Sequence, residues 1–377
     1  MLSYWEKASY VNYDLIVVGG GISGLFTALS FKKNHPRAKI AILERGIFPS
    51  GASTKNAGFA CFGSVSELIE DSKNMSDESL FNLVKNRVLG LELLKSTISI
   101  KKLGLQNNGG YELFFKDDIS LKKSMDKINN LLHPIFKKKV FRFSNDDILK
   151  FGFSKEQIRQ LIFNPFESQI NTGSAIFELQ KLVSKKGIII FTGANVENFI
   201  LHSNKNDIIV LNQGTKITFK SKFLAICSNA FTKKWFPDYD IKPGRGMVVI
   251  TKPISNLKFK GCFHYNKGYN YFRNFGNRII LGGGRNLDFE NEQTTSFGIN
   301  QTIKNSLIKD LESIILPDIK YELDTEWSGI MSFGKTKEPI IKKITENAVM
   351  GVRLGGMGVA IGSLVGKKVS DLLLEKG

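Results

Sequence analysis

A short apolar run leads directly into a glycine-rich turn near the start of the chain, and this order constrains the fold more than any other feature. Residues 13–18 read YDLIVV, which is typical of a buried strand, and GGGISG follows them. Residues 25–33 have an apolar helical face, and a second apolar run at 39–43 ends in Glu44. This order predicts a βαβ unit of the dinucleotide-binding type.

The glycines and the acid each have a role in such a unit. Gly19 permits a tight turn, Gly21 lets main-chain N–H groups approach a pyrophosphate, and Gly24 allows close packing of helix on strand. Glu44 lies where a carboxylate accepts hydrogen bonds from an adenosine ribose. GxGxxG alone is a weak signal, but the flanking strand, helix and acid make it specific for NAD or FAD. The turn residues predicted to bind the cofactor are Gly19, Gly21, Ile22, Ser23 and Gly24.

The segment after Glu44, RGIFPSGASTKNAGF, has no helical or strand period and is rich in small residues. It resembles the matching loop of the D-amino-acid oxidase superfamily of flavoproteins, which contains glycine oxidase, sarcosine oxidase and D-amino-acid dehydrogenase. The resemblance implies a loop that runs along the FAD pyrophosphate, with Lys55 and Asn56 as candidates for polar contacts near the flavin ring. The implied binding residues are Arg45, Gly51, Ala52, Ser53, Lys55, Asn56 and Ala57.

The resemblance extends along the chain. Residues 187–190 and 193–196 resemble the family strand whose valine main chain contacts adenine, and residues 223–230 resemble a strand and turn near the flavin. Residues 349–359, followed by an amphipathic helix to Leu374, resemble the C-terminal FAD element, whose turn amides would face the pyrimidine end of the flavin. The residues implied here are Val196, Ser228, Asn229, Gly355, Gly356, Met357, Gly358 and Val359.

Segments of another character lie between these elements. Residues 76–103 carry apolar side chains at helical spacing, and residues 241–285 read as sheet. Gly282–Gly284 lead into RNLDFENE rather than a helix, so no second dinucleotide motif for NAD(P)H is predicted. We predict an α/β (α+β overall) fold, with a Rossmann-like FAD-binding domain interleaved with a mixed-sheet substrate domain. The expected segments are 1–75, 165–235 and 336–377 for the first domain, and 76–164 and 236–335 for the second.

In the family such a sheet covers the reactive face of the flavin, so substrate contacts are expected there. Residues 243–247 resemble the family's P-x-(R/K)-G-Q turn, which places Arg245 either at the active-site mouth or in a positioning salt bridge. Tyr271 and Arg273 share one strand face and either bind a carboxylate together or form a solvated pair. These three are the catalytic candidates, and His264 is read as a satisfied strand histidine. Tyr269 and Arg285 complete the polar groups of this sheet.

One position departs from the family pattern. Residues 327–332 with 339–340 resemble the family's W-x-G-x-R-P…P-x-I segment, whose arginine pairs with an amino-acid carboxylate. This chain has Met331 there, which cannot donate to a carboxylate, so either the substrate is not a simple α-amino acid or its anchor lies elsewhere. No cysteine here matches the one that bears covalent flavin in sarcosine oxidases, which predicts non-covalent FAD. The alternative anchors are Arg245, Arg273, Lys335 and Lys337.

We therefore expect oxidation of a C–N bond of an amino acid or amine, with hydride transfer to FAD N5 and hydrolysis of the imine. The electron acceptor is oxygen, a quinone or a carrier protein. Two alternatives stay open. One is 2-hydroxy-acid or polyol oxidation, for which a base such as His264 is useful. The other is trimming of an aminomethyl group on tRNA, in which the positive charge has a role. A non-catalytic FAD-binding module is disfavoured because the flavin-adjacent loops are intact.

Composition supports a globular enzyme. Hydrophobic residues make up 42% of the chain, which excludes disorder. The net charge is +18, but only ten of 53 cationic residues are arginine and the lysines are scattered, so a solvated surface is favoured over nucleic-acid binding. The three cysteines form no CxxC pair, and no metal site is expected. No apolar run reaches the roughly 18 residues of a spanning helix, so we expect a cytoplasmic protein whose aromatic head, Leu2 to Trp5, packs on the domain.

Overall fold

The first sheet is built around the opening strand of the motif. In the computed structural model, which describes residues 1–212 and 214–375, this strand pairs in parallel with two neighbours, and a further parallel strand lies beyond each of them. In spatial order the main strands are β17 (Ile340–Thr345), β18 (Ala348–Val352), β11 (Thr215–Ile226), β1 (Asn12–Val18), β2 (Ile40–Leu43) and β8 (Ile189–Phe191). The antiparallel strands β10 (Asn206–Asn212) and β9 (Asn195–Leu201) extend from β11.

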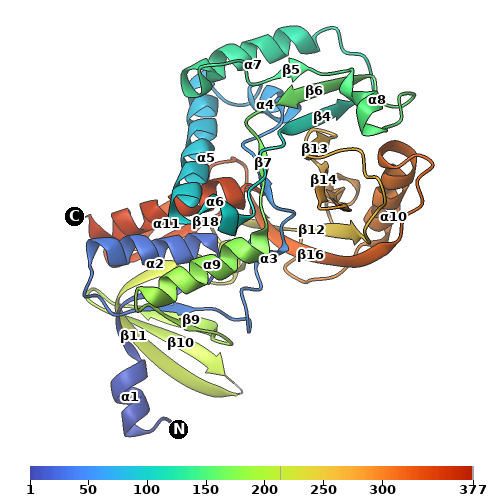
Figure 1. The fold of residues 1–377 in the computed structure, drawn as a ribbon. Coiled ribbons are helices and arrows are strands. Elements are labelled where there is room, and N and C mark those ends of the chain that lie inside the picture. The colour runs from blue at the N-terminus through green and yellow to red at the C-terminus, as the bar shows by residue number, and fades with distance from the viewer. Residues whose placement is uncertain (213, 376–377) are drawn as a thin grey trace.

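Alternate residues of β1 point to opposite faces of this sheet. Leu15 and Val17 lie in a core with side chains of α2 (Ile22–Asn34), α9 (Thr172–Lys185) and α11 (Gly358–Leu374). Ile16 and Val18 lie in a separate core with side chains of β9, β10 and β11. Figure 1 shows the helices on one side of the sheet and the β9–β10 ribbon on the other. The sheet is therefore Rossmann-like, with strands in place of helices over one face.

The second sheet is antiparallel except where β13 meets β4. Its face away from the first sheet's loops packs on α10 (Gln301–Asp310) and contains a cluster of phenylalanines. In spatial order the strands are β16 (Leu323–Phe333), β12 (Lys242–Thr251), β15 (Arg278–Gly283), β14 (Asn270–Phe275), β13 (Cys262–Tyr265), β4 (Gly110–Phe114), β6 (Gln160–Asn164) and β5 (Arg142–Phe143). A short ribbon of β3 (Phe59–Ala60) and β7 (Ser168–Gln169) connects the two regions.

The strands of the two sheets come from the two sets of segments that the sequence assigns to two domains, while the boundaries themselves stay predictions. The long helix α5 (Asp77–Thr97) crosses this division, because its C-terminal half packs on α11. A Cβ on Gly90 would lie 2.1 Å from the carbonyl oxygen of Ala360, so the two helices are in backbone contact. The remaining helices are α3 (Ala52–Lys55), α4 (Val65–Asp71), α6 (Ile100–Leu103), α7 (Leu121–Phe136) and α8 (Asp147–Phe151).

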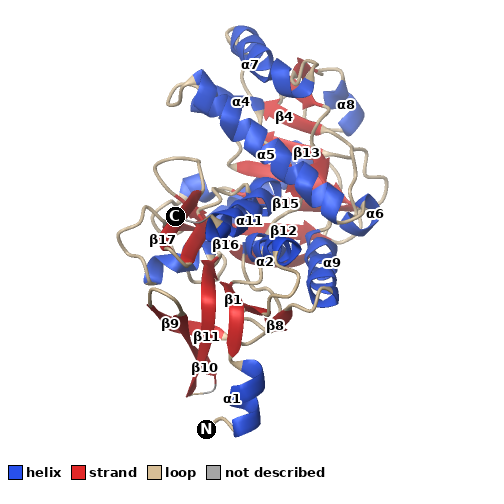
Figure 2. Cartoon of the chain, turned by 90° about the vertical axis from the view of Figure 1, so that its left-hand side faces the viewer, coloured by secondary structure: helices blue, strands red, loops and turns tan. Residues whose placement is uncertain are grey.

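The aromatic head of the chain does not pack on the body, contrary to expectation. Ser3 and Glu6 form a capping box that begins α1 (Tyr4–Tyr10), and no residue of this helix is buried. Tyr4 and Trp5 are each 75% exposed and pack edge to face on one another. In Figures 1 and 2, α1 lies at the opposite end of the molecule from α7. Within the described part of the chain, none of the helices has both the length and the apolar character needed to cross a membrane.

Candidate active site

A cavity of about 770 Å³ opens at the carboxyl ends of the parallel strands and continues along the second sheet. Val18 and Leu43, the last residues of β1 and β2, line it together with Cys227 directly after β11. On the opposite side it is bounded by Gly246 and Val248 of β12. Ligands of open α/β sheets bind outside such strand ends, so this cavity is the candidate active site.

The glycine turn has the geometry that its sequence predicts at two positions. Gly19 adopts φ +109°, and a Cβ on Gly24 would lie 1.9 Å from the carbonyl oxygen of Gly19, so close helix-to-turn packing requires glycine. Gly21 faces Ser53, whose Oγ accepts a 3.0 Å hydrogen bond from the N–H of Ile22 at the start of α2. A side chain of the following loop thus caps the helix. The turn residues that line the cavity are Gly19, Gly21, Ile22 and Ser23, with Gly24 packed behind them.

Glu44 is buried and joins the turn to the loop that follows β2. Its Oε2 accepts from the N–H of Gly20 at 2.9 Å, and its Oε1 accepts from the N–H of Gly46 at 3.0 Å and from Ser50 Oγ at 3.2 Å. An ionised carboxylate has about four acceptor positions, so Oε2 retains capacity for a ribose hydroxyl. Glu44 therefore both orders the two loops and lines the cavity where the sequence places the adenosine.

The loop at residues 45–57 is ordered by its own side chains. The Asn56 amide donates to the carbonyls of Ala52 and Ser53 at 3.0 and 2.9 Å, and its oxygen accepts from the N–H of Gly58 at 2.9 Å. This side chain therefore stabilises the loop, and its predicted contact near the flavin ring stays a prediction. The loop residues that line the cavity are Arg45, Gly51, Ala52, Ser53, Lys55, Asn56 and Ala57.

At the end of the cavity near β9, the expected adenine side, cationic side chains meet aromatic rings. The Arg45 guanidinium lies 3.5 Å from the centroid of the Phe231 ring. Lys234 Nζ donates to the carbonyl of Val196 at 2.7 Å, and burial lowers the pKa of this lysine. The residues at this end that line the cavity are Arg45, Val196, Ser228, Phe231 and Lys234.

The C-terminal turn forms another part of the cavity wall. Gly355 and Gly356 have φ of +58° and +78°, and Met357, Gly358 and Val359 continue from this turn into α11. Asn229, which follows β11, holds the turn, because its side-chain oxygen accepts from the N–H groups of Arg353 and Leu354 at 3.0 and 3.3 Å. A Cβ on Gly366 would lie 2.4 Å from the carbonyl oxygen of Ser23, so α11 packs tightly on α2. The residues Asn229, Gly355, Gly356, Met357, Gly358 and Val359 all line the cavity.

We call the cavity-facing residues of the second sheet, Gly246, Val248, His264, Tyr271, Met331 and Phe333, the sheet wall. A Cβ on Gly246 would lie 2.8 Å from Cε of Met331, and a Cβ on Gly282 would lie 2.8 Å from the Tyr271 ring, so glycines make room for both side chains. Burial raises the pKa of Tyr271 to about 12, and its ring packs edge to face on Phe59.

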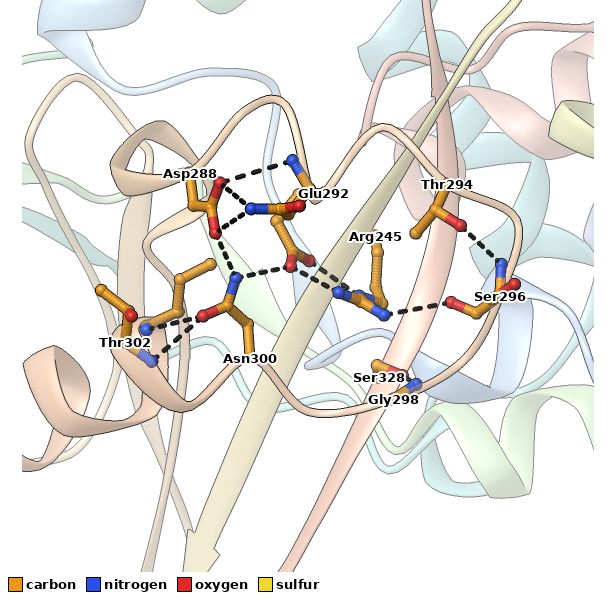
Figure 3. A network of polar contacts seen from close by, with 11 residues as sticks. Arg245, Asp288, Glu292, Thr294, Ser296, Gly298, Asn300, Thr302 and Ser328 are labelled. Atoms are coloured by element: carbon orange, nitrogen blue, oxygen red, sulfur yellow. Dashed lines mark hydrogen bonds and ion pairs between the residues drawn. The ribbon is translucent and has the colours of Figure 1, made fainter.

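Of the three catalytic candidates, only Tyr271 lines the cavity. Arg245 instead forms a paired contact with Glu292, at 2.9 Å from Nε and 2.7 Å from Nη2 (Figure 3). Arg273 is buried and donates to the carbonyls of Ala57 and Ile170, which belong to the cofactor loop and the end of the β7 region. Neither guanidinium is a free anchor for a carboxylate. Both contacts join positions far apart in sequence, which strand alternation alone does not reveal.

His264 is satisfied, as expected, and it also lines the cavity. Its Nε2 lies 3.0 Å from Oε2 of Glu167, and both side chains are buried. Desolvation alone would lower the pKa of His264, but the charge and hydrogen bond of Glu167 raise it to about 9. His264 is therefore an imidazolium at neutral pH, held by its contact with Glu167.

The sequence interpretation missed the contribution of α4 to the cavity. Its residues Glu70 and Asp71 line the mouth and pair with Lys267 at 3.1 Å and Lys337 at 2.7 Å. Lys337, proposed as an alternative anchor, is thus already paired. The available signal was the capping box that Ser64 opens, which identifies a helix start but not its location. Lys335, the other lysine proposed, is not part of the cavity lining.

Comparison with known proteins places this geometry in a family. The family model described as FAD dependent oxidoreductase (DAO) matches residues 14–372. Among curated proteins, the chain is similar to glycine oxidase of Geobacillus kaustophilus (strain HTA426), with 22% identity over 387 residues that cover 97% of this chain and 93% of that protein.

Solved structures of similar fold cover nearly the whole chain. Glycine oxidase from Geobacillus kaustophilus has a TM-score of 0.76 at 19% identity, covering 96% of this chain and 95% of that one. L-proline dehydrogenase from P. horikoshii has a TM-score of 0.74 at 18% identity, covering 97% and 94%. L-α-glycerophosphate oxidase from Mycoplasma pneumoniae, with FAD bound, has a TM-score of 0.77 at 15% identity, covering 97% and 95%. The chain belongs to the DAO family of FAD-dependent oxidoreductases.

Proposed function

We propose that this flavoenzyme oxidises a C–N bond of an amino acid or of a primary or secondary amine, and that the imine product is hydrolysed by water. Bound FAD supplies the acceptor, N5, for the hydride that leaves the α-carbon. A neutral amine can lose hydride without a side-chain base. The protein then needs to bind the substrate, orient it against the flavin and keep water away.

The pairing of His264 with the buried carboxyl group of Glu167 is the observation that carries this proposal. An alcohol substrate must also lose a proton from oxygen, which calls for a base on the cavity wall. His264 is paired with Glu167, and its pKa near 9 keeps it protonated at neutral pH. A protonated imidazole cannot accept that proton. An amine whose ammonium proton has passed to water can instead lose hydride directly and leave an iminium that water hydrolyses.

The described residues fit FAD. The first turn of α2 presents main-chain N–H groups that lack intrahelical acceptors, as at any helix N-terminus. The N-terminus of α11 lies on the same cavity, where its dipole favours negative charge at the pyrimidine end of the flavin. Glu44 supplies the carboxylate expected near a ribose. The contacts are non-covalent, so denaturation in acid should release FAD intact.

The test is anaerobic bleaching of the purified yellow protein against matched panels of amines, amino acids and 2-hydroxy acids. We expect at least one amine or amino acid to bleach the flavin absorbance near 450 nm, with the corresponding carbonyl compound and ammonia or amine as products. Bleaching by hydroxy acids alone would overturn the proposal. Reoxidation with oxygen, a soluble quinone or an artificial carrier then identifies the acceptor.

Oxidation of a 2-hydroxy acid or polyol is the second candidate, because His264 does lie on the cavity wall. If it acts as the base, activity should rise with pH through about 9 and be lost in His264→Gln. Action on tRNA has less support. The lysines at the cavity mouth, Lys267 and Lys337, are neutralised by Glu70 and Asp71 rather than presented to a polyanion.

A further inference from the structure

Arg285 is the arginine at the sheet-wall end of the cavity. Of the described arginines, Arg45 and Arg285 line this cavity, and Arg45 lies at its other end beside Phe231. Gly283 and Gly284, with φ of +108° and +74°, end β15 and turn the chain into the short helical turn η2 (Arg285–Leu287). The glycine run at 282–284, which is not part of a second nucleotide motif, therefore positions the Arg285 side chain.

Two aromatic rings hold the Arg285 guanidinium. Its central carbon lies 4.1 Å from the centroid of Phe333 and 4.7 Å from that of Phe289. Stacking uses the flat faces of the guanidinium and leaves its N–H donors, which lie in the plane, free to bond. Among the described residues, none forms a side-chain hydrogen bond or ion pair with Arg285.

Two acids of the neighbouring loop, Asp288 and Glu292, already have hydrogen-bond partners. Both oxygens of Glu292 accept from Arg245, and Oε1 also accepts from Asn300 at 3.0 Å. Asp288 accepts from Asn300 at 2.8 Å and from Asn291. Figure 3 shows these carboxylates directed into this network. Glu292 thus directs both oxygens to Arg245 rather than to Arg285. Burial lowers the pKa of Arg285, and the charges of Tyr269 and Glu292 partly oppose that shift.

The location of Arg285 relates it to the missing arginine at position 331. A Cβ on Gly356, in the turn at the expected flavin end, would lie 3.7 Å from Sδ of Met331 and 3.9 Å from the Phe333 ring. Phe333 in turn contacts Arg285. A cation is therefore retained near the same turn, stacked on the Phe333 ring rather than placed at position 331.

We propose that Arg285 binds an oxyanion of the substrate, most simply the carboxylate of an amino acid, in place of an arginine at position 331. The guanidinium plane presents two parallel N–H donors to such a group. The carboxylate lies beyond Phe333, so the cavity suits amino acids whose carboxylate is held away from Met331. The inference rests on the proposed function in one respect, which is that the bound anion is taken to be part of the substrate.

The test is binding rather than turnover. Acetate, benzoate, glutarate, inorganic phosphate and the uncharged benzamide are titrated into the flavin-loaded protein, with binding followed by calorimetry and by the shift of the flavin spectrum. Arg285→Met should raise the Kd of the anion that wild type binds by on the order of 10- to 100-fold. The Kd of Arg285→Lys should lie between those of wild type and Arg285→Met, because lysine keeps the charge without the paired donors. Benzamide binding should not change.

Arg142→Met is the matched control. Arg142 also stacks on a phenylalanine, Phe163 at 4.8 Å, but lies outside the cavity lining. The variant Arg142→Met should therefore leave the Kd of every ligand unchanged. Equal Kd values in wild type and a folded, yellow Arg285→Met protein would overturn the inference, as would equal weakening in both variants. Tighter Arg285-dependent binding of phosphate than of any carboxylate would support the anion site and identify a phosphate as the substrate's group. The titration reports on Arg285 even if no amine bleaches the flavin.

Discussion

The two sides of the cavity are built in different ways. On the side of the first sheet, the predicted cofactor cradle (residues 19–24, 45–57 and 354–359) is rich in glycines and short polar side chains. On the sheet wall, His264 and Tyr271 present long side chains to the site, and both contact residues of other segments. The cradle is therefore specified locally, whereas the wall is specified by tertiary contacts. Each prediction below tests that contrast.

The largest effect is expected from Gly24→Ala in the cradle. Its new methyl group would lie 1.9 Å from the carbonyl oxygen of Gly19, so the turn and α2 must separate. We expect loss of bound FAD and a free energy of unfolding lower by about 3 kcal/mol. The ratio of absorbance at 450 nm to that at 280 nm measures bound FAD, and urea unfolding measures the free energy of unfolding. Gly173→Ala is the control, because Gly173 lies outside the cavity lining and its methyl group would meet only Asn171 Oδ1, at 3.4 Å, so this variant should stay yellow. Equal FAD content in the two variants would contradict a backbone-defined cradle.

Arg273→Met tests the link between the two sides. Removing this buried guanidinium leaves the carbonyls of Ala57 and Ile170 without their donor. We expect destabilisation of about 2 to 3 kcal/mol together with weaker FAD binding, measured by unfolding and by FAD titration of the apoprotein. Arg278→Met, which breaks a more exposed contact with Asp324, should cost no more than about 1 kcal/mol and leave FAD affinity intact. A normal FAD affinity in Arg273→Met would mean that the loop needs no support from β14.

The buried pair of His264 and Glu167 predicts a pH dependence on the wall alone. The folded pKa of His264, about 9, exceeds its ordinary value of 6.5. Its stabilising contribution is therefore complete below about pH 6.5 and is lost as pH rises through 9. Between pH 7 and 10, the unfolding free energy of wild type should fall by about 2 kcal/mol more than that of His264→Gln. Parallel curves for the two proteins would show that Glu167 does not hold the imidazole charged.

The smallest effect on stability is expected from Tyr271→Phe. The Tyr271 hydroxyl lines the cavity and, among the described residues, donates to no acceptor. We expect an unfolding free energy within about 0.5 kcal/mol of wild type. The kcat/KM for the amine or amino-acid substrate should fall by roughly 10-fold if the hydroxyl bonds the substrate. An unchanged kcat/KM would make Tyr271 only a packing element of the wall.

Much of the cradle could be predicted from sequence because its determinants are neighbours in the chain. Gly19, Gly24 and Glu44 stand at fixed spacing around one strand and one helix, so the motif carries the geometry. Arg245 and Arg273 could not be placed, because their partners, Glu292 and the Ala57 carbonyl, belong to other segments. Strand alternation gives the face on which a side chain lies but not what it meets there.

The surroundings of Arg285 also could not be predicted from the sequence. Its segment was recognised as a glycine run that lacks a following helix, and that reading agrees with the turn into η2. The guanidinium lies in the cavity wall because Phe289 and Phe333 stack on it and because Glu292 pairs with Arg245 instead. Pattern analysis identifies such a residue as a candidate, while only the assembled contacts distinguish it from its neighbours.

The packing of α11 on α2 also bears on biosynthesis. α11 follows every other described element in chain order, yet its N-terminus completes the cradle begun by the first strand. A ribosome-bound nascent chain makes the glycine turn long before it makes the C-terminal turn that we predict to complete the FAD site. Chains that stop before α11 should therefore not retain flavin.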